Sequence, residues 1–190
     1  MRDVDVHCRV LANHCRADFL SPAERERAAR FRRARDRQTF IARRVFLREI
    51  LSQYAGADPA AIEFVRGEFG KPRVNYAELR FSASYSSGLA LIAVSRTREI
   101  GVDVERIDPA FDREAVARHF FCGGEVGAAL ASAEEFFRLW TRKEAFLKAL
   151  GVGFSLAPEN FDLSVDRPGW SLESFSPAPG YIATLAANLP

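Results

Sequence analysis

The sequence predicts an α+β fold made of two pseudo-symmetric lobes, each with a long helix packed on an antiparallel sheet. Three observations support this prediction: strand-like and helical segments alternate, short turns join neighbouring strands, and this order occurs twice along the 190 residues. The lobes should comprise residues 1–97 and 98–190, with a cleft between them. Residue identity between the halves is too weak to establish a repeat from sequence alone.

Helix and strand signals justify the first lobe. A helix is predicted to begin at Ser21, because Pro22 stands at the first helical position and Glu24 can complete a capping box. The helical pattern should break near residues 35–36, resume, and end by Gly56. The expected strands are residues 62–65, 79–84 and 89–95, the last two forming a hairpin around residues 86–88.

The second half shows the same order of signals. Its strands contain alternating or β-branched residues, and its longest helical segment has an apolar stripe at helical spacing. The expected elements are a strand at 100–107, helices at 113–121 and 134–150, and strands at 161–165 and 181–187.

The composition is that of a globular protein, with 48% apolar and 27% charged residues. No run of about 18 apolar residues is present to cross a membrane. Residues 1–6 lack the apolar segment of a signal peptide. We therefore expect a cytoplasmic location and no membrane partner.

The three cysteines, Cys8, Cys15 and Cys122, are odd in number and form no close pair, which argues against a disulfide framework. His7 and His14 precede two of them and could suggest a zinc site. Residues 4–10 alternate between apolar and polar side chains, however, and this pattern places Cys8 on the buried face of a strand. We therefore expect Cys8 to belong to the core.

Positive charge is concentrated in residues 21–50, which hold ten arginines against four acidic residues. This asymmetry favours an anionic partner, although basic helix faces are often only solvated. A nucleic-acid-binding module is therefore one alternative function. It would leave the motifs of the second half unexplained.

The lysines are few and are placed differently from the arginines. Only three of the 27 basic residues are lysine, and they are Lys71, Lys143 and Lys148. A lysine is a compact point charge suited to a phosphate, whereas arginine is a rigid fork. The lysines are therefore candidate site residues.

An acidic strand is the first candidate metal site. Residues 100–107 alternate, so Val102 and Val104 share one face and Asp103 and Glu105 the other. Two neighbouring carboxylates suit a hard cation, and Mg²⁺ typically takes one or two of them together with substrate phosphates. Taken alone, the pattern also fits an acidic strand facing solvent.

The helix at 134–150 carries the other candidates. Lys143 falls in the middle of its apolar stripe, whereas Glu144 and Lys148 lie one turn apart on its flank. Glu144 could complete the metal site of the acidic strand, with an ammonium beside it. An ordinary stabilising pair at i and i+4 is the simpler alternative.

Together these motifs resemble the Sfp-type 4′-phosphopantetheinyl transferases. The family joins Gly-[Val/Ile]-Asp-x-Glu on a strand to Trp-x-x-Lys-Glu-[Ala/Ser]-x-x-Lys on a helix, and both are complete here at 101–105 and 140–148. Segments similar to its first basic helix, its Gly-Lys-Pro turn, its Phe-Asn-x-Ser-His-Ser segment and its C-terminal lobe stand at 21–27, 70–72, 81–86 and 151–163.

The resemblance implies an enzyme of the holo-[acyl-carrier-protein] synthase type. Such enzymes move the 4′-phosphopantetheine arm of coenzyme A onto a serine of an apo acyl, peptidyl or aryl carrier protein and release 3′,5′-ADP. It implies that Asp103, Glu105 and Glu144 hold Mg²⁺ and that Glu144 and Lys148 are catalytic, with either Glu144 or a metal-bound water taking the serine proton. The implied coenzyme-binding residues are Arg27, Lys71, Ser84, Tyr85, Lys143 and Lys148.

One position departs from the family pattern. Tyr85 stands where the family usually has histidine, and Ser87 looks like an insertion beside it. Because tyrosine carries no positive charge, a phosphate contact there would be weaker. A relative that binds carrier proteins without catalysis is therefore a further alternative. We expect a monomer, and the sequence does not identify the carrier protein or pathway.

Overall fold

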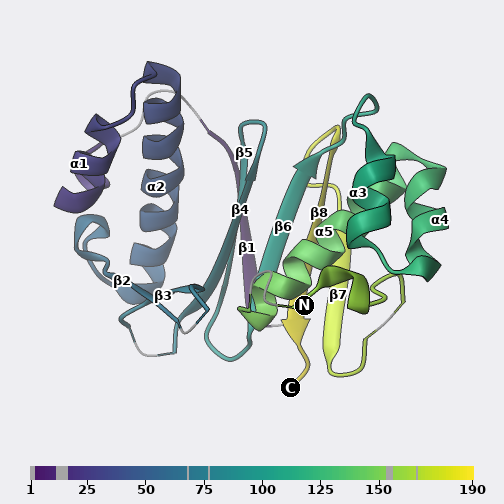
Figure 1. Ribbon diagram of the computed structural model, residues 1–190. Coiled ribbons are helices and arrows are strands. Elements are labelled where there is room, and N and C mark those ends of the chain that lie inside the picture. Colours follow the sequence, from purple (N-terminus) through teal and green to yellow (C-terminus); the bar gives the residue numbers. More distant parts are fainter. Residues whose placement is uncertain (1–2, 12–16, 68, 77, 153–155, 166) are drawn as a thin grey trace.

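The computed structural model describes residues 3–11, 17–67, 69–76, 78–152, 156–165 and 167–190. These residues form helices and small sheets (Figure 1), and every strand pairing among them is antiparallel. The predicted α+β fold class is confirmed. Among these residues, no helix combines the length and apolar character needed to cross a membrane.

The first half contains a three-stranded sheet, a two-stranded hairpin and two main helices. The large sheet has the strand order β1-β5-β4, and β2 pairs with β3. The long helix α2 packs its apolar side chains against β4 and β5. The elements are β1 (Val4–Val10), α1 (Pro22–Ala29), α2 (Ala34–Ala55), β2 (Phe64–Arg66), β3 (Pro72–Val74), β4 (Arg80–Ser86) and β5 (Leu89–Ser95).

The second half contains a three-stranded sheet and three helices. Its strand order is β6-β8-β7, and the long helix α5 lies against β6 and β8. The elements are β6 (Ile100–Arg106), α3 (Arg113–Phe120), α4 (Gly123–Ala131), α5 (Ala133–Leu150), β7 (Trp170–Phe175) and β8 (Tyr181–Asn188).

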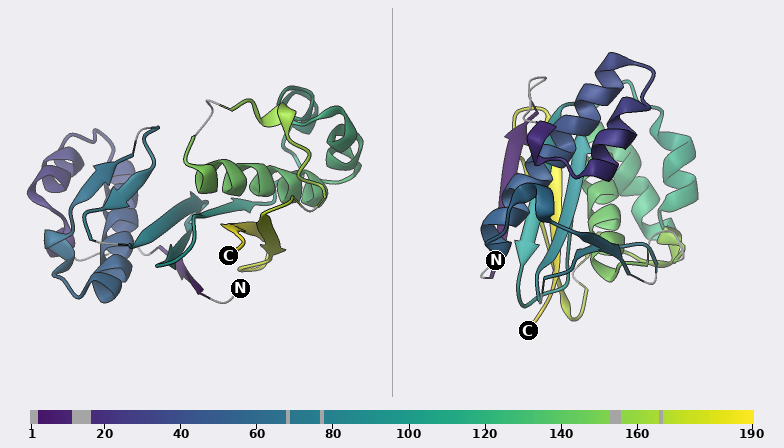
Figure 2. Two further views of the ribbon diagram at one scale, coloured as in Figure 1. Left: turned by 90° about the horizontal axis from the view of Figure 1, so that it is seen from below. Right: turned by 90° about the vertical axis from the view of Figure 1, so that its left-hand side faces the viewer.

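Both halves follow one plan. In each sheet the first strand pairs with the last strand of that half, and the last strand pairs with the one before it. The sheets meet at the centre of the molecule, with the helices of the two halves on opposite sides (Figure 2). A core cluster joins them, in which Leu91 of β5 packs with Val102 of β6 and Leu185 of β8.

Three predicted helix ends are confirmed, and the predicted break between the first two helices is shifted. Ser21 forms the predicted capping box with Glu24, and both long helices end at a glycine in the left-handed conformation, Gly56 and Gly151. The break between α1 and α2 falls at residues 30–33, before the predicted position. The predicted hairpin is confirmed, with Ser87 and Gly88 at its turn, both at positive φ.

The prediction for Cys8 is wrong, because its side chain is exposed. Alternation in β1 separates two faces, but the face that packs against α2 is the polar one. His7 accepts or donates a hydrogen bond at 2.8 Å to the hydroxyl of Tyr54, and Arg9 binds Glu49 on the same helix. The face with Val6, Cys8 and Val10 is therefore the open one, although Val4 at its start packs against a core cluster. His14 and Cys15 lie outside the described residues.

The predicted strand at 161–165 is also wrong. Its backbone is held by side chains of α5 and α4: Arg142 donates to Leu163 O, Lys143 donates to Phe161 O, and Leu163 N donates to Glu125. The third strand of this sheet is β7 instead. The helix α4 was not predicted, because its three glycines give it a low helix propensity.

Candidate functional site

The acidic strand β6 lies against α5 and presents its carboxylates to that helix. Asp103 is buried, with 3% of its surface exposed. Its Oδ1 accepts hydrogen bonds from Lys148 Nζ at 2.6 Å and from Ser84 Oγ at 2.7 Å. The predicted meeting of the acidic strand with the flank of α5 is thus present in the fold.

Glu105 and Glu144 are half-buried in the same neighbourhood. Burial raises the pKa of Glu144, the charges of Asp103 and Glu105 raise it further, and Lys148 opposes them. Burial also raises the pKa of Glu105, with the Asp103 charge adding to the effect and the Ser86 hydrogen bond opposing it. Three mutually repelling carboxylates therefore surround one ammonium.

Asp103 provides a test of whether this site fits a cation. Its Oδ2 is buried and has no hydrogen-bond partner among the described residues. A buried oxygen without a partner destabilises the folded protein unless something binds it. A carboxylate oxygen is a ligand that Mg²⁺ prefers. The donor set of Asp103, Glu105 and Glu144 fits a hard divalent cation.

A tighter acidic group lies elsewhere in the described part of the chain. Ligand atoms of Cys122, Glu125 and Asp162 all lie within 4.8 Å of one another, closer than those of the three carboxylates around Lys148. Lys143 Nζ stands 2.7 Å from the Glu125 carboxylate, however. Both oxygens of Glu125 already have partners, Leu163 N on Oε1 and Lys143 Nζ on Oε2, so we do not consider this group a metal site.

A cavity of about 270 Å³ opens beside Glu144 and Lys148. The turn at 70–72 lines it from the first half, together with residues 81–83 of β4. Lys71 donates to Glu99, to Ile100 O and to Ala149 O, so its three N–H donors are all used within the protein. Burial is the main cause that lowers the pKa of Lys71.

A larger groove of about 710 Å³ is lined in part by Glu105. Aromatic side chains of α3 and α5, including Phe120, Phe137 and Trp140, form much of its wall, and Ser86 stands with Glu105 at its edge. Two hollows therefore adjoin the acidic site, one lined by Glu144 and Lys148 and the other by Glu105.

Three predicted coenzyme-binding residues lie apart from this centre. Lys143 is buried, with its Nζ 2.9 Å from Pro158 O and 2.5 Å from Phe161 O. Tyr85 packs against the α2 core under Arg43, and burial raises its pKa to about 12. Arg27 is exposed on α1, with its guanidinium 5.2 Å from the centre of the Phe40 ring.

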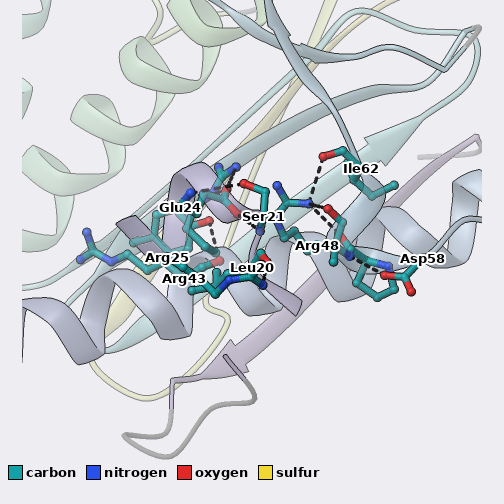
Figure 3. Close-up of polar contacts among 12 residues, drawn as sticks. Leu20, Ser21, Glu24, Arg25, Arg43, Arg48, Asp58 and Ile62 are labelled. Atoms are coloured by element: carbon teal, nitrogen blue, oxygen red, sulfur yellow. Dashed lines mark hydrogen bonds and ion pairs between the residues drawn. The ribbon is translucent and has the colours of Figure 1, made fainter. Parts of the chain in front are cut away.

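Part of the basic segment serves the fold (Figure 3). Glu24 binds both Arg44 and Arg48, and Arg48 also donates to Ile62 O at 2.9 Å. Arg25 donates to Leu20 O at 2.6 Å. These contacts account for three of the ten arginines, so less of the local charge faces solvent than the sequence indicated.

Sequence reasoning missed two groups of residues at or near the site. Ser82 and Ser86 join Ser84 in binding β6 across the junction of the two sheets. Glu125 is fully buried against Lys143. The alternation of serines at 82, 84 and 86 was a readable signal for the first group, whereas nothing local marked Glu125.

Comparisons with known proteins agree with this geometry. Residues 99–180 match a family described as the 4′-phosphopantetheinyl transferase superfamily, and residues 12–97 match one described as 4′-phosphopantetheinyl transferase, N-terminal. The chain is 38% identical to 4′-phosphopantetheinyl transferase HetI of Nostoc sp. over 187 residues, covering 90% of this chain and 79% of the relative. It is 31% identical to 4′-phosphopantetheinyl transferase Sfp of Bacillus subtilis, covering 87% and 76%.

The comparisons identify the protein as a transferase with an α+β fold. The chain belongs to the 4′-phosphopantetheinyl transferase superfamily.

Proposed function

We propose that the protein transfers the 4′-phosphopantetheine group of coenzyme A to a serine of an apo carrier protein, releasing 3′,5′-ADP. The observation that carries the proposal is the convergence of Asp103 and Lys148 next to the cavity that Glu144 lines. Phosphoryl transfer requires little covalent help from the protein beyond positioning and neutralisation of charge. This site offers both.

Asp103, Glu105 and Glu144 would hold Mg²⁺ in this proposal. The orphaned Oδ2 of Asp103 supports it, since that oxygen is buried and has no other described partner. When bound, Mg²⁺ neutralises the oxygens of the coenzyme pyrophosphate. Lys148 contributes a second positive charge at the same place.

The protein's own groups account for the remaining step. The acceptor serine Oγ bonds to the phosphorus next to the pantetheine, the bond from that phosphorus to the 3′,5′-ADP oxygen breaks, and the serine proton goes to a carboxylate oxygen of Glu144. Glu144 is the candidate base because it lines the cavity beside Lys148, within the site where the serine must react. Lys148 stabilises the charge that develops on the leaving group.

The two hollows suggest separate routes for the two substrates. The cavity beside Lys71 and Lys148 would take the phosphates of coenzyme A, with Lys71 shaping the wall through its bonds to the backbone. The larger groove beside Glu105 would receive the carrier protein. Carboxylates of the acidic site line both hollows, Glu144 one and Glu105 the other, so the serine and the phosphorus could meet there.

We further propose that residues 1–97 and 98–190 are two lobes of one monomer that works in the cytoplasm without a nucleic-acid partner. The separate family matches to residues 12–97 and 99–180 support this division. Lys143, Tyr85 and Arg27 would then act mainly outside the reaction centre, because none of the three lines the cavity beside Lys148.

Mass spectrometry tests the proposed function. Purified protein is incubated with Mg²⁺, coenzyme A and a panel of apo carrier proteins from fatty acid, polyketide and nonribosomal peptide synthesis. The expected result is a mass gain of one phosphopantetheine group on at least one carrier, abolished by chelation of Mg²⁺. No mass gain on any carrier that a reference transferase loads would overturn the proposal.

A further inference from the structure

The two sheets meet through side chains. β4 and β6 are edge strands of separate sheets, so no backbone ladder joins them. Instead, three serines of β4, which we call the serine row, accept hydrogen bonds from backbone N–H groups of β6. The bonds are Val102 N to Ser82 Oγ at 3.0 Å, Val104 N to Ser84 Oγ at 3.3 Å, and Arg106 N to Ser86 Oγ at 3.1 Å.

The regular spacing of these bonds has a simple cause. Alternate residues of a strand direct their N–H groups to the same edge, and alternate side chains share a face. Each bond therefore joins residues 20 apart, and β4 and β6 run in the same direction with their repeats matched. The serine row gives partners to these edge N–H groups, of which those of Val102 and Val104 are buried.

Two members of the row also bind the acidic site. Ser84 Oγ donates to Asp103 Oδ1, and Ser86 Oγ donates to Glu105 Oε2, both at 2.7 Å. A serine hydroxyl has one proton to donate. Because the backbone N–H of β6 occupies a lone pair of the same oxygen, the O–H bond is free to point at the carboxylate. Ser82 makes the backbone contact to β6, and no carboxylate contact to it is found within the described residues.

Ser84 has no hydrogen-bonding capacity left. Its oxygen accepts from Val104 N and from Lys148 Nζ at 3.2 Å, while its proton goes to Asp103. The two lone pairs and the single proton of the hydroxyl are thus all used. Ser84 could bind a phosphate of the coenzyme only by releasing one of these partners.

We propose that Ser84 and Ser86 are positioning residues, which fix the carboxylates of Asp103 and Glu105 for the divalent cation across the junction of the two sheets. Ser84 and Lys148 together engage Oδ1 of Asp103, and the other oxygen, Oδ2, stays free for the cation. The serine row thereby couples the arrangement of the two halves to metal affinity. The inference rests on the proposed function, because the cation belongs to that site.

Direct binding measurements test the serine row. Mg²⁺ is titrated by calorimetry into the full chain with coenzyme A present and no carrier protein. Ser84→Ala and Ser86→Ala should each weaken Mg²⁺ binding by about 10- to 100-fold, the usual effect of losing a partner that orients a metal ligand. Ser86→Thr, which keeps the hydroxyl, should restore affinity.

A control separates positioning from general loss of stability. Ser95→Ala removes a buried serine whose contacts, within the described residues, are all to backbone groups: Asp3 O and the N–H groups of residues 97 and 98. This variant should lower stability and leave Mg²⁺ affinity within about twofold of the parent.

The outcomes distinguish this inference from the proposed function. If the parent binds Mg²⁺ and loads a carrier while Ser84→Ala and Ser86→Ala bind Mg²⁺ equally well, the positioning role is overturned and the function stands. A parent that neither binds Mg²⁺ nor loads any carrier would overturn both. If Ser84→Ala fails to fold, the comparison of Ser86→Ala with Ser86→Thr decides the question.

Discussion

The two halves of the molecule each contain a buried ionic clamp built on the same plan. In each, a cation of the long helix binds the carbonyl groups of a short 3₁₀ turn that follows. Arg48 of α2 donates to the turn at Pro59–Ala61, and Lys143 of α5 donates to the turn at Pro158–Asn160. Each cation is 98% buried.

The carboxylate of each clamp also comes from an equivalent position. Glu24 and Glu125 both stand at the third position of a short helix and close its capping box, α1 in one half and α4 in the other. Glu24 binds Arg48 at 2.5 Å and Glu125 binds Lys143 at 2.7 Å. This agreement extends the shared strand order to individual side chains.

The halves differ at the residue after each clamp cation. Glu49 follows Arg48 and binds Arg9 of the edge strand β1. Glu144 follows Lys143 and lines the cavity beside Lys148. The clamp therefore only stabilises the fold in the first half. In the second half, the same arrangement also places the Glu144 carboxylate at the cavity beside Lys148.

The largest expected difference between the halves is in activity. Glu144→Gln should lower transfer by about 100-fold or more, because it removes a charged ligand and the proposed base without changing the side-chain volume. Glu49→Gln, at the matching position, should stay within about twofold of the parent, since it loses only a surface ion pair. Initial rates at saturating coenzyme A measure both. Equal rates would show that the two positions are functionally equivalent.

The second prediction compares the clamps themselves. Lys143→Met should lower the free energy of unfolding by about 3–5 kcal/mol, because it leaves a fully buried carboxylate without its cation. Arg48→Met should cost less, since Glu24 keeps Arg44 and is 12% exposed. Urea unfolding of both variants measures the difference.

A double variant provides the control for the Lys143 clamp. Glu125→Gln added to Lys143→Met removes the stranded charge and should recover part of the lost stability. No recovery would mean that Lys143 stabilises the fold through its carbonyl contacts rather than through the ion pair.

The third prediction compares the glycines that end the two long helices. Gly56→Ala should cost about 1–2 kcal/mol, because alanine is strained at a φ of 63° although no atom lies within 4 Å of the added Cβ. Gly151→Ala should cost more, since its Cβ would meet Lys71 Cδ at 2.8 Å. It should also weaken coenzyme A binding, measured by calorimetry. A normal affinity would show that Lys71 does not shape that site.

Short-range spacing made much of the site predictable. Glu144 and Lys148 are one helical turn apart, and Asp103 and Glu105 are two residues apart on a strand, so periodicity alone placed each pair on one face. The capping box of Ser21 and Glu24 is equally local. Their meeting across β6 and α5 was one hypothesis from the helix flank, beside an ordinary i, i+4 pair, and the family resemblance implied it.

The failures arose where tertiary contacts decide. Alternation in β1 separated two faces of a strand, but only the position of Tyr54 and Glu49 on α2 decides which face is covered, so Cys8 was misplaced. Residues 161–165 contain strand-forming side chains, yet Lys143 and Arg142 donate hydrogen bonds to two carbonyl oxygens of this segment. Neither competing partner is near in sequence.

The smallest expected effects concern pH, and they should have opposite signs in the two halves. Burial raises the pKa of Glu24, but the Arg48 hydrogen bond, the Arg44 charge and the Ser21 N–H together lower it below its ordinary value of 4.5. Glu24 therefore stabilises the fold above about pH 4.5, and this contribution is lost as pH falls through its lowered pKa. Glu24→Gln should accordingly flatten the acid side of the melting profile.

Glu144 should act in the other direction. Its pKa is raised, first by burial and then by Asp103, so its contribution to the stability of the metal-free protein is full below pH 4.5 and is lost as pH rises through the raised pKa. Glu144→Gln should therefore raise the melting temperature at pH 8 in the presence of a chelator and leave it nearly unchanged at pH 4. Melting curves across this range measure the effect, and Glu49→Gln gives the comparison at the matching position, where the Arg9 hydrogen bond lowers the pKa of Glu49 and the trend should be opposite. A parallel profile for parent and Glu144→Gln would show that the carboxylates around Lys148 do not repel one another, and the case for a cation among them would lose its electrostatic support.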